Sequence, residues 1–239
     1  MASAFPPTRH SVIERLRRDD TEERAAAFGD VVDAYWKPIY KHFRATWNAS
    51  PEDAQDLTQS FFSDAFEKAW LEKYEPGKAR FRTFVRVCVD RFAMNARQAS
   101  NRAKRGGGAR LVSLDFETAE QEVRAQSLQS PADAEDFFRQ EFVRALFQRA
   151  IAAAREELTR SGRAVHFQLF ERYDLQPDDH VSYASLAAEF HLTESRVTNY
   201  LSVARRAFRS HALGALRGLS ASDEEFRREA RELFGMDVD

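Results

Sequence analysis

Residues 183–202 read YASLAAEFHLTESRVTNYLS, and this stretch carries the most specific local pattern of the 239-residue chain. Apolar side chains at helical spacing form the inner faces of two successive helices: Tyr183, Leu186, Ala187 and Phe190 in the first, and Val197, Leu201, Ala204 and Phe208 in the second. The small side chain of Ala187 allows the two helices to cross closely. The pattern therefore predicts a DNA-binding helix-turn-helix, although an ordinary helical hairpin with a charged face would show the same spacing.

The turn between these helices departs from the usual pattern at one residue, because His191 stands where a glycine is common. Histidine tolerates a left-handed φ better than most residues, so we expect the turn to form despite this departure. Polar and basic side chains point outward from the second helix: Glu194, Ser195, Arg196, Thr198, Asn199, Ser202, Arg205, Arg206 and Arg209. We expect the early ones to reach base edges in the major groove and the later arginines to contact phosphates.

The composition predicts a mostly helical protein, because glycine (9 residues) and proline (7 residues) are scarce and helix formers are plentiful. A single cysteine, Cys88, excludes an internal disulfide framework and a multi-cysteine zinc site. It also fits a reducing compartment, so we expect a cytoplasmic protein. No apolar run approaches the roughly 18–20 residues of a membrane span, and no export signal is visible, which predicts no membrane partner.

Charge is segregated along the chain, although the formal net charge is only -2. Residues 78–110 hold ten Lys and Arg against one Asp, and residues 195–217 hold five arginines and no acid. Residues 51–77 hold seven acids against two lysines, and residues 111–141 hold eight acids against two arginines. Two basic blocks separated by acidic ones predict two contacts with polyanions. For either block alone, a solvated helix face is the alternative.

Helix-start signals and chain breakers divide the sequence into parts. Ser11–Glu14 and Ser222–Glu225 fit capping boxes, and Ser50 precedes a proline suited to the first helical position. The longest break is the run Gly106-Gly107-Gly108, which a helix cannot easily cross. We therefore predict an all-α protein with helical domains over residues 7–105 and 131–218, a flexible linker over 106–130, and a C-terminal amphipathic extension over 219–239.

Residues 51–70 predict an amphipathic helix with an acidic stripe. Its apolar face comprises Ala54, Leu57, Phe61, Ala65 and Ala69. Asp53, Asp56, Ser60, Asp64 and Glu67 fall within about 80° of one another on a different face. Carboxylates at this spacing repel each other, which favours docking of a basic surface, and a solvated acidic face is the alternative. No histidine stands at ligand spacing, so we expect no metal site, no catalytic site and no cofactor.

Residues 80–105 predict a basic helix whose apolar face contains Cys88 as a small core residue. Basic and amide side chains line the opposite side: Arg82, Arg86, Arg97, Asn101 and Arg102. The preceding turn, residues 73–78, brings Lys73, Tyr74 and Lys78 beside it. An aromatic and several cations together suit a single nucleic-acid strand. For Tyr74, packing at a helix end is the alternative.

Two stretches, SPEDAQDLTQSFF (residues 50–62) and RFRTFVRVCVDRF (residues 80–92), resemble region 2 of bacterial extracytoplasmic-function (ECF) sigma factors of the sigma-70 family. Residues 182–209 are similar to region 4 of the same family, and the two parts stand in the family's order. The resemblance covers about residues 28–105 and 139–212. It implies an alternative sigma factor, a subunit without enzymatic activity that binds core RNA polymerase and directs promoter-specific transcription initiation.

The resemblance also implies a role for each surface. The clamp of the largest polymerase subunit would bind the acidic stripe, through Asp53, Asp56, Gln59, Ser60, Asp64 and Glu67. The −10 element would be held by Lys73, Tyr74, Lys78, Arg82, Arg86, Arg97, Asn101 and Arg102. The outward residues of the helix-turn-helix would read the −35 element. The flap of the second-largest subunit is a further expected partner, and the linker would run toward the RNA exit channel.

Two departures from the family qualify this interpretation. Many members carry a glutamate where this chain has Ser60, and a phosphoryl group there would restore nearly two negative charges. We therefore hypothesise a Ser/Thr kinase as a partner, with Ser60 as the modified residue and Thr58 as the second candidate, beside an anti-sigma factor. The other departure is the extension, whose apolar residues Phe226, Ala230, Leu233 and Phe234 require a surface. It would pack on the C-terminal domain or cover a binding face.

Two other functions remain open at this stage. A helix-turn-helix regulator would bind duplex DNA without polymerase, usually as a dimer, and its N-terminal domain would sense a ligand or partner. A nucleic-acid-processing enzyme would need carboxylates or a nucleophile in a pocket, whereas the acids here form an outward stripe. The chain also has no Walker-type phosphate loop, because Gly106 to Gly108 lack the following Lys-Ser/Thr.

Overall fold

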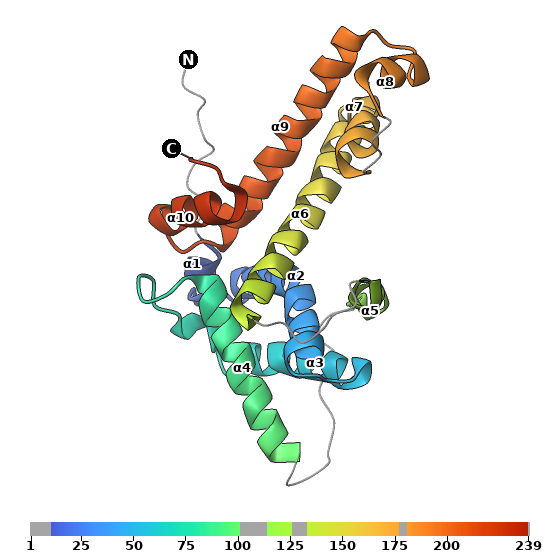
Figure 1. Cartoon of the computed structure of the whole chain (residues 1–239). Helices are drawn as coiled ribbons and strands as arrows, with labels where there is room; N and C mark the ends of the chain where they lie inside the picture. The colour runs from blue at the N-terminus through green and yellow to red at the C-terminus, as the bar shows by residue number, and fades with distance from the viewer. Residues whose placement is uncertain (1–10, 101–113, 126–132, 177–180, 239) are drawn as a thin grey trace. The chain divides into compact units, whose positions relative to one another are not determined.

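The computed structural model describes residues 11–100, 114–125, 133–176 and 181–238. All regular elements of this described part are helical, and no strand occurs in it, which confirms the all-α prediction. In chain order (Figure 1) the helices are α1 (Val12–Leu16), α2 (Thr21–Thr46), α3 (Pro51–Glu67), η1 (Leu71–Lys73), α4 (Phe81–Ser100), α5 (Phe116–Ala125), α6 (Ala134–Arg160), α7 (Ala164–Phe170), the π-helical turn η2 (Glu171–Leu175), α8 (Tyr183–Glu189), α9 (Glu194–Leu219) and α10 (Asp223–Phe234).

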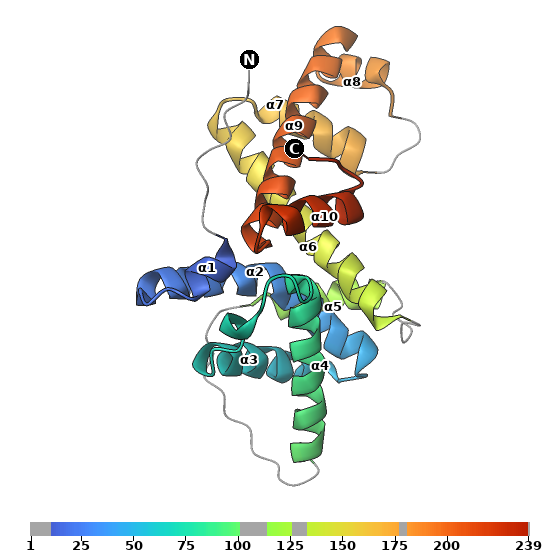
Figure 2. The same cartoon turned by 90° about the vertical axis from the view of Figure 1, so that its left-hand side faces the viewer.

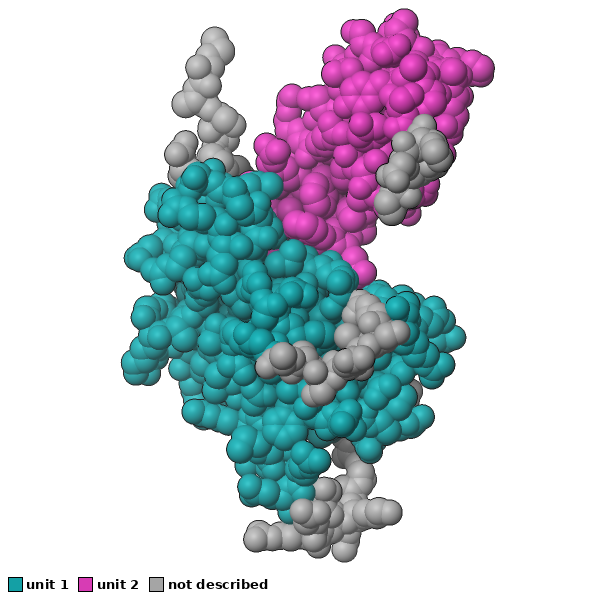
Figure 3. All heavy atoms as spheres, viewed as in Figure 1, with its two compact units in different colours: residues 1–145, 216–239 teal, residues 146–215 magenta. Residues whose placement is uncertain are grey.

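The chain divides into two compact units (Figure 3). Unit 1 comprises residues 1–145 and 216–239, and unit 2 comprises residues 146–215. The division falls inside α6 and α9, so it differs from the predicted domain limits at residues 105, 130 and 218. The reason is long-range packing, because the first part of α6 and the whole of α10 belong to the core built by the N-terminal helices.

Helix α2 is the centre of unit 1 and packs against α1, α3, α4 and α5. The aromatic ring of Tyr35 on α2 stacks on Phe142 of α6 at 4.9 Å between centroids and meets Phe81 of α4 edge-on at 5.9 Å. Lys41, which is 1% exposed, lies 2.7 Å from carboxylate oxygens of both Glu122 and Glu141. Unit 1 therefore combines an aromatic core with buried ion pairs that join distant parts of the chain.

Most of the predicted helix starts are present. Ser11 and Glu14 form a reciprocal capping box, and the Ser50 side chain accepts a hydrogen bond from the backbone of Asp53 with Pro51 at the first helical position. Ser222 caps α10 by accepting from the backbone N–H of Glu225. The Glu225 carboxylate does not complete a capping box, because it accepts from Ala221 and from groups of α4 instead. The Gly106–Gly108 break lies outside the described residues.

Residues 116–125 were predicted to be part of a flexible linker, but they form α5 and pack on α2. The ring of Phe116 meets Trp36 at 5.6 Å and Tyr40 at 5.3 Å. The Glu120 carboxylate accepts hydrogen bonds from the Tyr40 hydroxyl at 2.7 Å and from Arg44 Nε at 2.9 Å. The Glu120 carboxylate of this acidic segment is therefore paired with side chains of α2.

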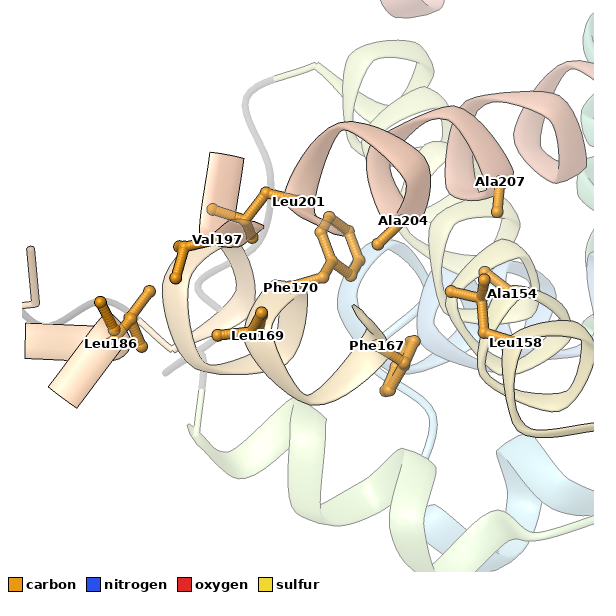
Figure 4. Packing of buried hydrophobic residues seen from close by; sticks show 11 residues of the cluster. Ala154, Leu158, Phe167, Leu169, Phe170, Leu186, Val197, Leu201, Ala204 and Ala207 are labelled. Atoms are coloured by element: carbon orange, nitrogen blue, oxygen red, sulfur yellow. The ribbon is translucent and has the colours of Figure 1, made fainter. Parts of the chain in front are cut away.

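Unit 2 is built from residues 146–215, with α7, η2 and α8 between its parts of α6 and α9. Its core (Figure 4) contains the labelled residues Ala154, Leu158, Phe167, Leu169, Phe170, Leu186, Val197, Leu201, Ala204 and Ala207. Most of these side chains are fully buried. Because α8 and the start of α9 share this core, their mutual arrangement is set by packing and by the turn between them.

Cys88 was predicted to be a small core residue of the basic helix. Burial raises the pKa of the Cys88 thiol to about 11, so this cysteine behaves as an unreactive, partly buried side chain, as predicted. Among the described residues, none of the helices has the length and apolar character needed to span a bilayer.

Candidate nucleic-acid interface

The predicted helix-turn-helix corresponds to α8, the turn after it and the first turns of α9. Leu186, Val197 and Leu201 are fully buried between the two helices, as their spacing predicts. His191 has a φ of 54°, which confirms that the turn requires a left-handed residue where a glycine is usual. The Leu192 N–H donates to the Ala187 carbonyl at 2.8 Å, and Thr193 caps α9 by accepting from the Arg196 N–H.

The outward face of α9 is open to solvent. Eight of the nine residues predicted to meet DNA are exposed: Glu194, Ser195, Arg196, Thr198, Asn199, Ser202, Arg206 and Arg209. The Thr198 hydroxyl donates a hydrogen bond to the Glu194 carbonyl at 3.0 Å. Its oxygen lone pairs and its methyl group remain available on the outward side. The first two turns thus present amide, hydroxyl and guanidinium groups suited to base edges, followed by two arginines suited to phosphates.

Arg205 is the exception, and its predicted role as a phosphate contact does not fit the structure. Its guanidinium donates to both oxygens of Asp174, from Nε at 3.0 Å and from Nη2 at 2.9 Å, and lies 5.5 Å from the centre of the Tyr173 ring. Asp174 is positioned by η2, a π-helical turn that the sequence pattern did not reveal. Arg205 is therefore a bidentate link inside unit 2, and its charge is already neutralised.

The basic face of α4 departs further from the prediction, because Arg82 and Arg86 are already engaged. Arg82 is only 3% exposed and pairs with Glu229 and Glu232 of α10. Arg86 lies 2.6 Å from Asp90 and also pairs with Glu135 of α6. These arginines were placed opposite the apolar face, but α6 and α10 cover that side of the helix. Neither guanidinium is available to DNA in this conformation.

Tyr74 is a packing residue here, as in the alternative considered for it, and not a stacking platform. Its side chain is 1% exposed and its ring meets Phe81 at 5.2 Å and Phe84 at 5.3 Å. The hydroxyl donates to the Ala79 carbonyl at 2.7 Å. Burial, the Glu225 carboxylate and the hydrogen bond to it raise the Tyr74 pKa above its ordinary value. A base could stack on this ring only after the surrounding contacts had opened.

Other predicted contacts with the −10 element are exposed. Lys73, Lys78 and Arg97 lie at the surface, and Lys78 makes an exposed ion pair with Glu75 at 2.6 Å. Asn101 and Arg102 lie outside the described residues. The loop and the C-terminal half of α4 therefore keep part of the basic character assigned to them, whereas the N-terminal half does not.

Sequence reasoning missed a second exposed stripe on α4. Arg91, Asn95 and Gln98 are exposed and stand at positions i, i+4 and i+7 of one helix face. Met94 beside them is 50% exposed, and a shallow hollow of about 250 Å³ is lined by Trp47, Met94, Arg97 and Gln98. The spacing of the three polar residues was the available signal. That signal is weak beside the larger number of arginines on the opposite side of the helix.

The acidic stripe lies on the outward side of α3. Asp53, Asp56 and Glu67 are exposed, Gln59, Ser60 and Asp64 are half-buried, and Asp64 pairs with Lys68 at 2.7 Å. Within the described part of the chain, no basic side chain pairs with Asp53 or Asp56.

The two candidate phosphorylation sites differ in access. The Ser60 side chain is partly exposed on the stripe. Thr58 is fully buried, and its hydroxyl donates to the Ala54 carbonyl at 2.7 Å. A kinase could therefore reach Ser60 in this conformation but not Thr58.

Taken by themselves, these surfaces can do three things: present a polar helix to a duplex groove, offer cations and an amide stripe to a second polyanion, and offer carboxylates to a basic partner. Comparisons with protein-family models, with curated proteins and with solved structures found no match for this chain. The function is therefore inferred from the residues and their placement.

Proposed function

We propose that this chain is an alternative sigma factor, which binds bacterial core RNA polymerase in the cytoplasm and directs it to promoters through the −10 and −35 elements. The observation that carries the proposal is the open face of α9, where a packed helix-turn-helix presents polar and basic side chains outward over its buried leucine and valine core. A DNA-binding helix-turn-helix places side chains at the first turns of its second helix in the major groove, and here those positions carry polar and basic side chains.

The other surfaces support the same division of labour. In this proposal the first turns of α9 read the −35 element as duplex, with Arg196 and Asn199 as the principal side chains. The exposed stripe of Arg91, Asn95 and Gln98, together with Arg97 and the loop lysines, holds the −10 element. Asn and Gln donate and accept hydrogen bonds at base edges, and arginine binds phosphates.

The acidic stripe of α3 supplies the contact with polymerase in this proposal. Exposed carboxylates such as Asp53 and Asp56, with which no basic side chain of the described residues pairs, favour a basic protein surface, such as a clamp of the largest polymerase subunit. The partial exposure of Ser60 is consistent with a phosphoryl group adding to this negative charge. Equal core-polymerase affinities of Ser60→Glu and Ser60→Ala would end that part of the proposal.

The test is run-off transcription with bacterial core polymerase on a library of promoters. We expect defined transcripts that require the protein, and we expect Asp56→Arg to abolish them at all promoters because it reverses a charge at the centre of the stripe. Asp33→Arg is the matched control, since Asp33 is an exposed carboxylate of α2 outside the stripe.

Two results would contradict the proposal. Absence of any defined start with core polymerase would do so, as would transcripts that survive Asp56→Arg unchanged. Sequence-specific binding of duplex DNA by the protein alone, without a polymerase requirement, would favour the helix-turn-helix regulator instead.

A further inference from the structure

Helix α10 occupies the N-terminal end of α4 (Figure 2). Its apolar side is inserted into unit 1, where Phe226 is 5% exposed and Ala230 is fully buried. The Arg217 guanidinium lies 4.8 Å from the centre of the Phe226 ring. The extension was expected to pack on the C-terminal domain or to cover a binding face, and the residues it touches include Tyr74 and Arg82, which the sequence predicted to hold the −10 element.

Three carboxylates of α10, spaced i, i+4 and i+7, form hydrogen bonds and ion pairs with donor groups at the start of α4. Glu225 accepts the Phe81 N–H at 2.7 Å, and its Oε2 lies 3.2 Å from the Tyr74 hydroxyl oxygen, whose single proton it shares with the nearer Ala79 carbonyl. Glu229 lies 3.0 Å from Arg80 Nε and 3.3 Å from Arg82 Nε. Glu232 accepts from Arg82 Nη2 at 3.2 Å and also pairs with Arg80.

The same donors could bind consecutive phosphate groups of a nucleic-acid strand. A backbone N–H at a helix start, a tyrosine hydroxyl and two guanidinium groups are typical phosphate ligands. In this structure the α10 carboxylates stand in the places of the phosphate oxygens. The negative side of α10 therefore resembles a nucleic-acid backbone in charge and in the donors that it occupies.

The Arg82 part of this contact is poorly satisfied, whereas Glu229 lies 3.0 Å from Arg80 Nε and Glu225 accepts the Phe81 N–H at 2.7 Å. The Arg82 hydrogen bonds, at 3.2 to 3.5 Å, are longer than the roughly 2.7–2.9 Å of good charge-assisted pairs. Arg82 Nη1 is buried without a hydrogen bond, 3.6 Å from Glu135. Burial raises the pKa of Glu229 in spite of the opposing charges of Arg82 and Arg80. Leaving buried charges imperfectly paired is costly, so this contact can be exchanged for a better one.

We infer that α10 is an intramolecular cover of a phosphate-binding surface, formed by Arg80, Arg82, Tyr74 and the start of α4, and that a DNA single strand displaces it. The inference rests on the proposed function, because it assigns this surface to the strand of the −10 element. In the free protein the cover keeps affinity for single strands low. Release of α10 exposes two arginines and frees the Tyr74 ring from its acidic neighbour.

The test measures binding of a labelled oligothymidine by fluorescence anisotropy, with the full chain and without polymerase. The variant Glu225→Gln/Glu229→Gln/Glu232→Gln removes the carboxylate charges, and we expect it to bind about tenfold more tightly than the unaltered protein at low salt. The dependence of log K on log salt should steepen by about 1.4, since each single-strand phosphate contact contributes roughly 0.7. Glu224→Gln is the matched control, because Glu224 is exposed and pairs with Arg228 of the same helix.

Unchanged affinity and unchanged salt dependence in the triple variant would overturn the inference, including the case in which neither protein binds. If circular dichroism shows that the triple variant has lost helix, the single variant Glu232→Gln decides, because the Glu232 side chain is one-third exposed and its removal leaves the buried carboxylate in place. It should bind at least twofold more tightly, and equal affinity would overturn the inference.

The same proteins are assayed for run-off transcription with core polymerase, which separates the two hypotheses. Defined transcripts together with unchanged oligothymidine affinity would support the proposed function and contradict the inference that α10 is a cover. Tighter oligothymidine binding without any defined transcript would support the cover and contradict the sigma-factor function.

Discussion

Helices α4 and α9 carry arginines at helical spacing, and both were predicted to bind DNA, but their arginines differ in exposure and pairing. On α9, Arg196, Arg206 and Arg209 lie at the surface. On α4, Arg82 and Arg86 pair with carboxylates of α6 and α10. A pattern of arginines on one helix face thus shows only that the face is basic. Whether those arginines are exposed depends on whether other parts of the chain supply carboxylates that pair with them.

The largest expected effect is on stability, and it distinguishes the covered side of α4 from its exposed side. Arg82→Ala should lower the free energy of unfolding of unit 1 by about 3 kcal/mol, because it leaves the buried Glu229 with only part of its counter-charge. Arg91→Ala on the exposed side of α4 should stay within about 0.5 kcal/mol. Urea unfolding followed by circular dichroism measures both. Equal effects would show that the coverage of Arg82 has no energetic weight.

The next effect concerns DNA and the open helix. Under the proposed function, Arg196→Ala should weaken recognition of the −35 element by about 2 kcal/mol, roughly thirtyfold, because it would remove a bidentate base contact. Its unfolding free energy should not change. Run-off transcription from matched promoters with and without the upstream element measures the loss, and Arg160→Ala, an exposed arginine paired with Glu156, is the control. A loss that is equal on both promoters would place Arg196 outside the base contacts.

A smaller effect distinguishes two neighbours on α9. Arg205→Ala should cost about 1 kcal/mol of stability, since a bidentate but partly exposed pair with Asp174 is removed. It should leave the salt dependence of duplex binding unchanged. Arg206→Ala should do the reverse, with little change in stability and a salt slope lower by about 0.9, the contribution of one phosphate. Identical salt slopes for the two variants would contradict the assignment of Arg205 to the interior of unit 2.

The smallest effect is the response of unit 1 to acid. Hydrogen bonds from Arg44 and Tyr40 hold the pKa of Glu120 below its ordinary value, so its contribution to α5 docking is lost as pH falls through that lowered pKa. Burial raises the pKa of Glu229, so the contribution of this one carboxyl to the docking of α10 does not weaken over the same fall in pH, because its neutral form is easier to bury. Hydrogen exchange, corrected for intrinsic rates, should therefore show α5 losing protection before α10. The opposite order would contradict both assignments.

Much of the local structure could be predicted from the residues. The caps at Ser11, Ser50 and Thr193, the inner face of the helix-turn-helix and the left-handed turn residue His191 all follow from side-chain chemistry within a few positions. The exposure of the acidic stripe of α3 follows in the same way, because an amphipathic helix buries its apolar face. These features depend on neighbours in the chain, which a sequence displays directly.

The sequence by itself determined the helical class, the helix starts and the polar outward face of α9. Only the tertiary structure decided which arginines remain exposed, that residues 116–125 dock on α2, and that α10 covers the start of α4. Phe81 and Glu225 stand 144 positions apart and still share a hydrogen bond. Contacts of that range depend on how amphipathic faces pair in three dimensions, and a helix with two polar sides does not specify which side its partners will cover.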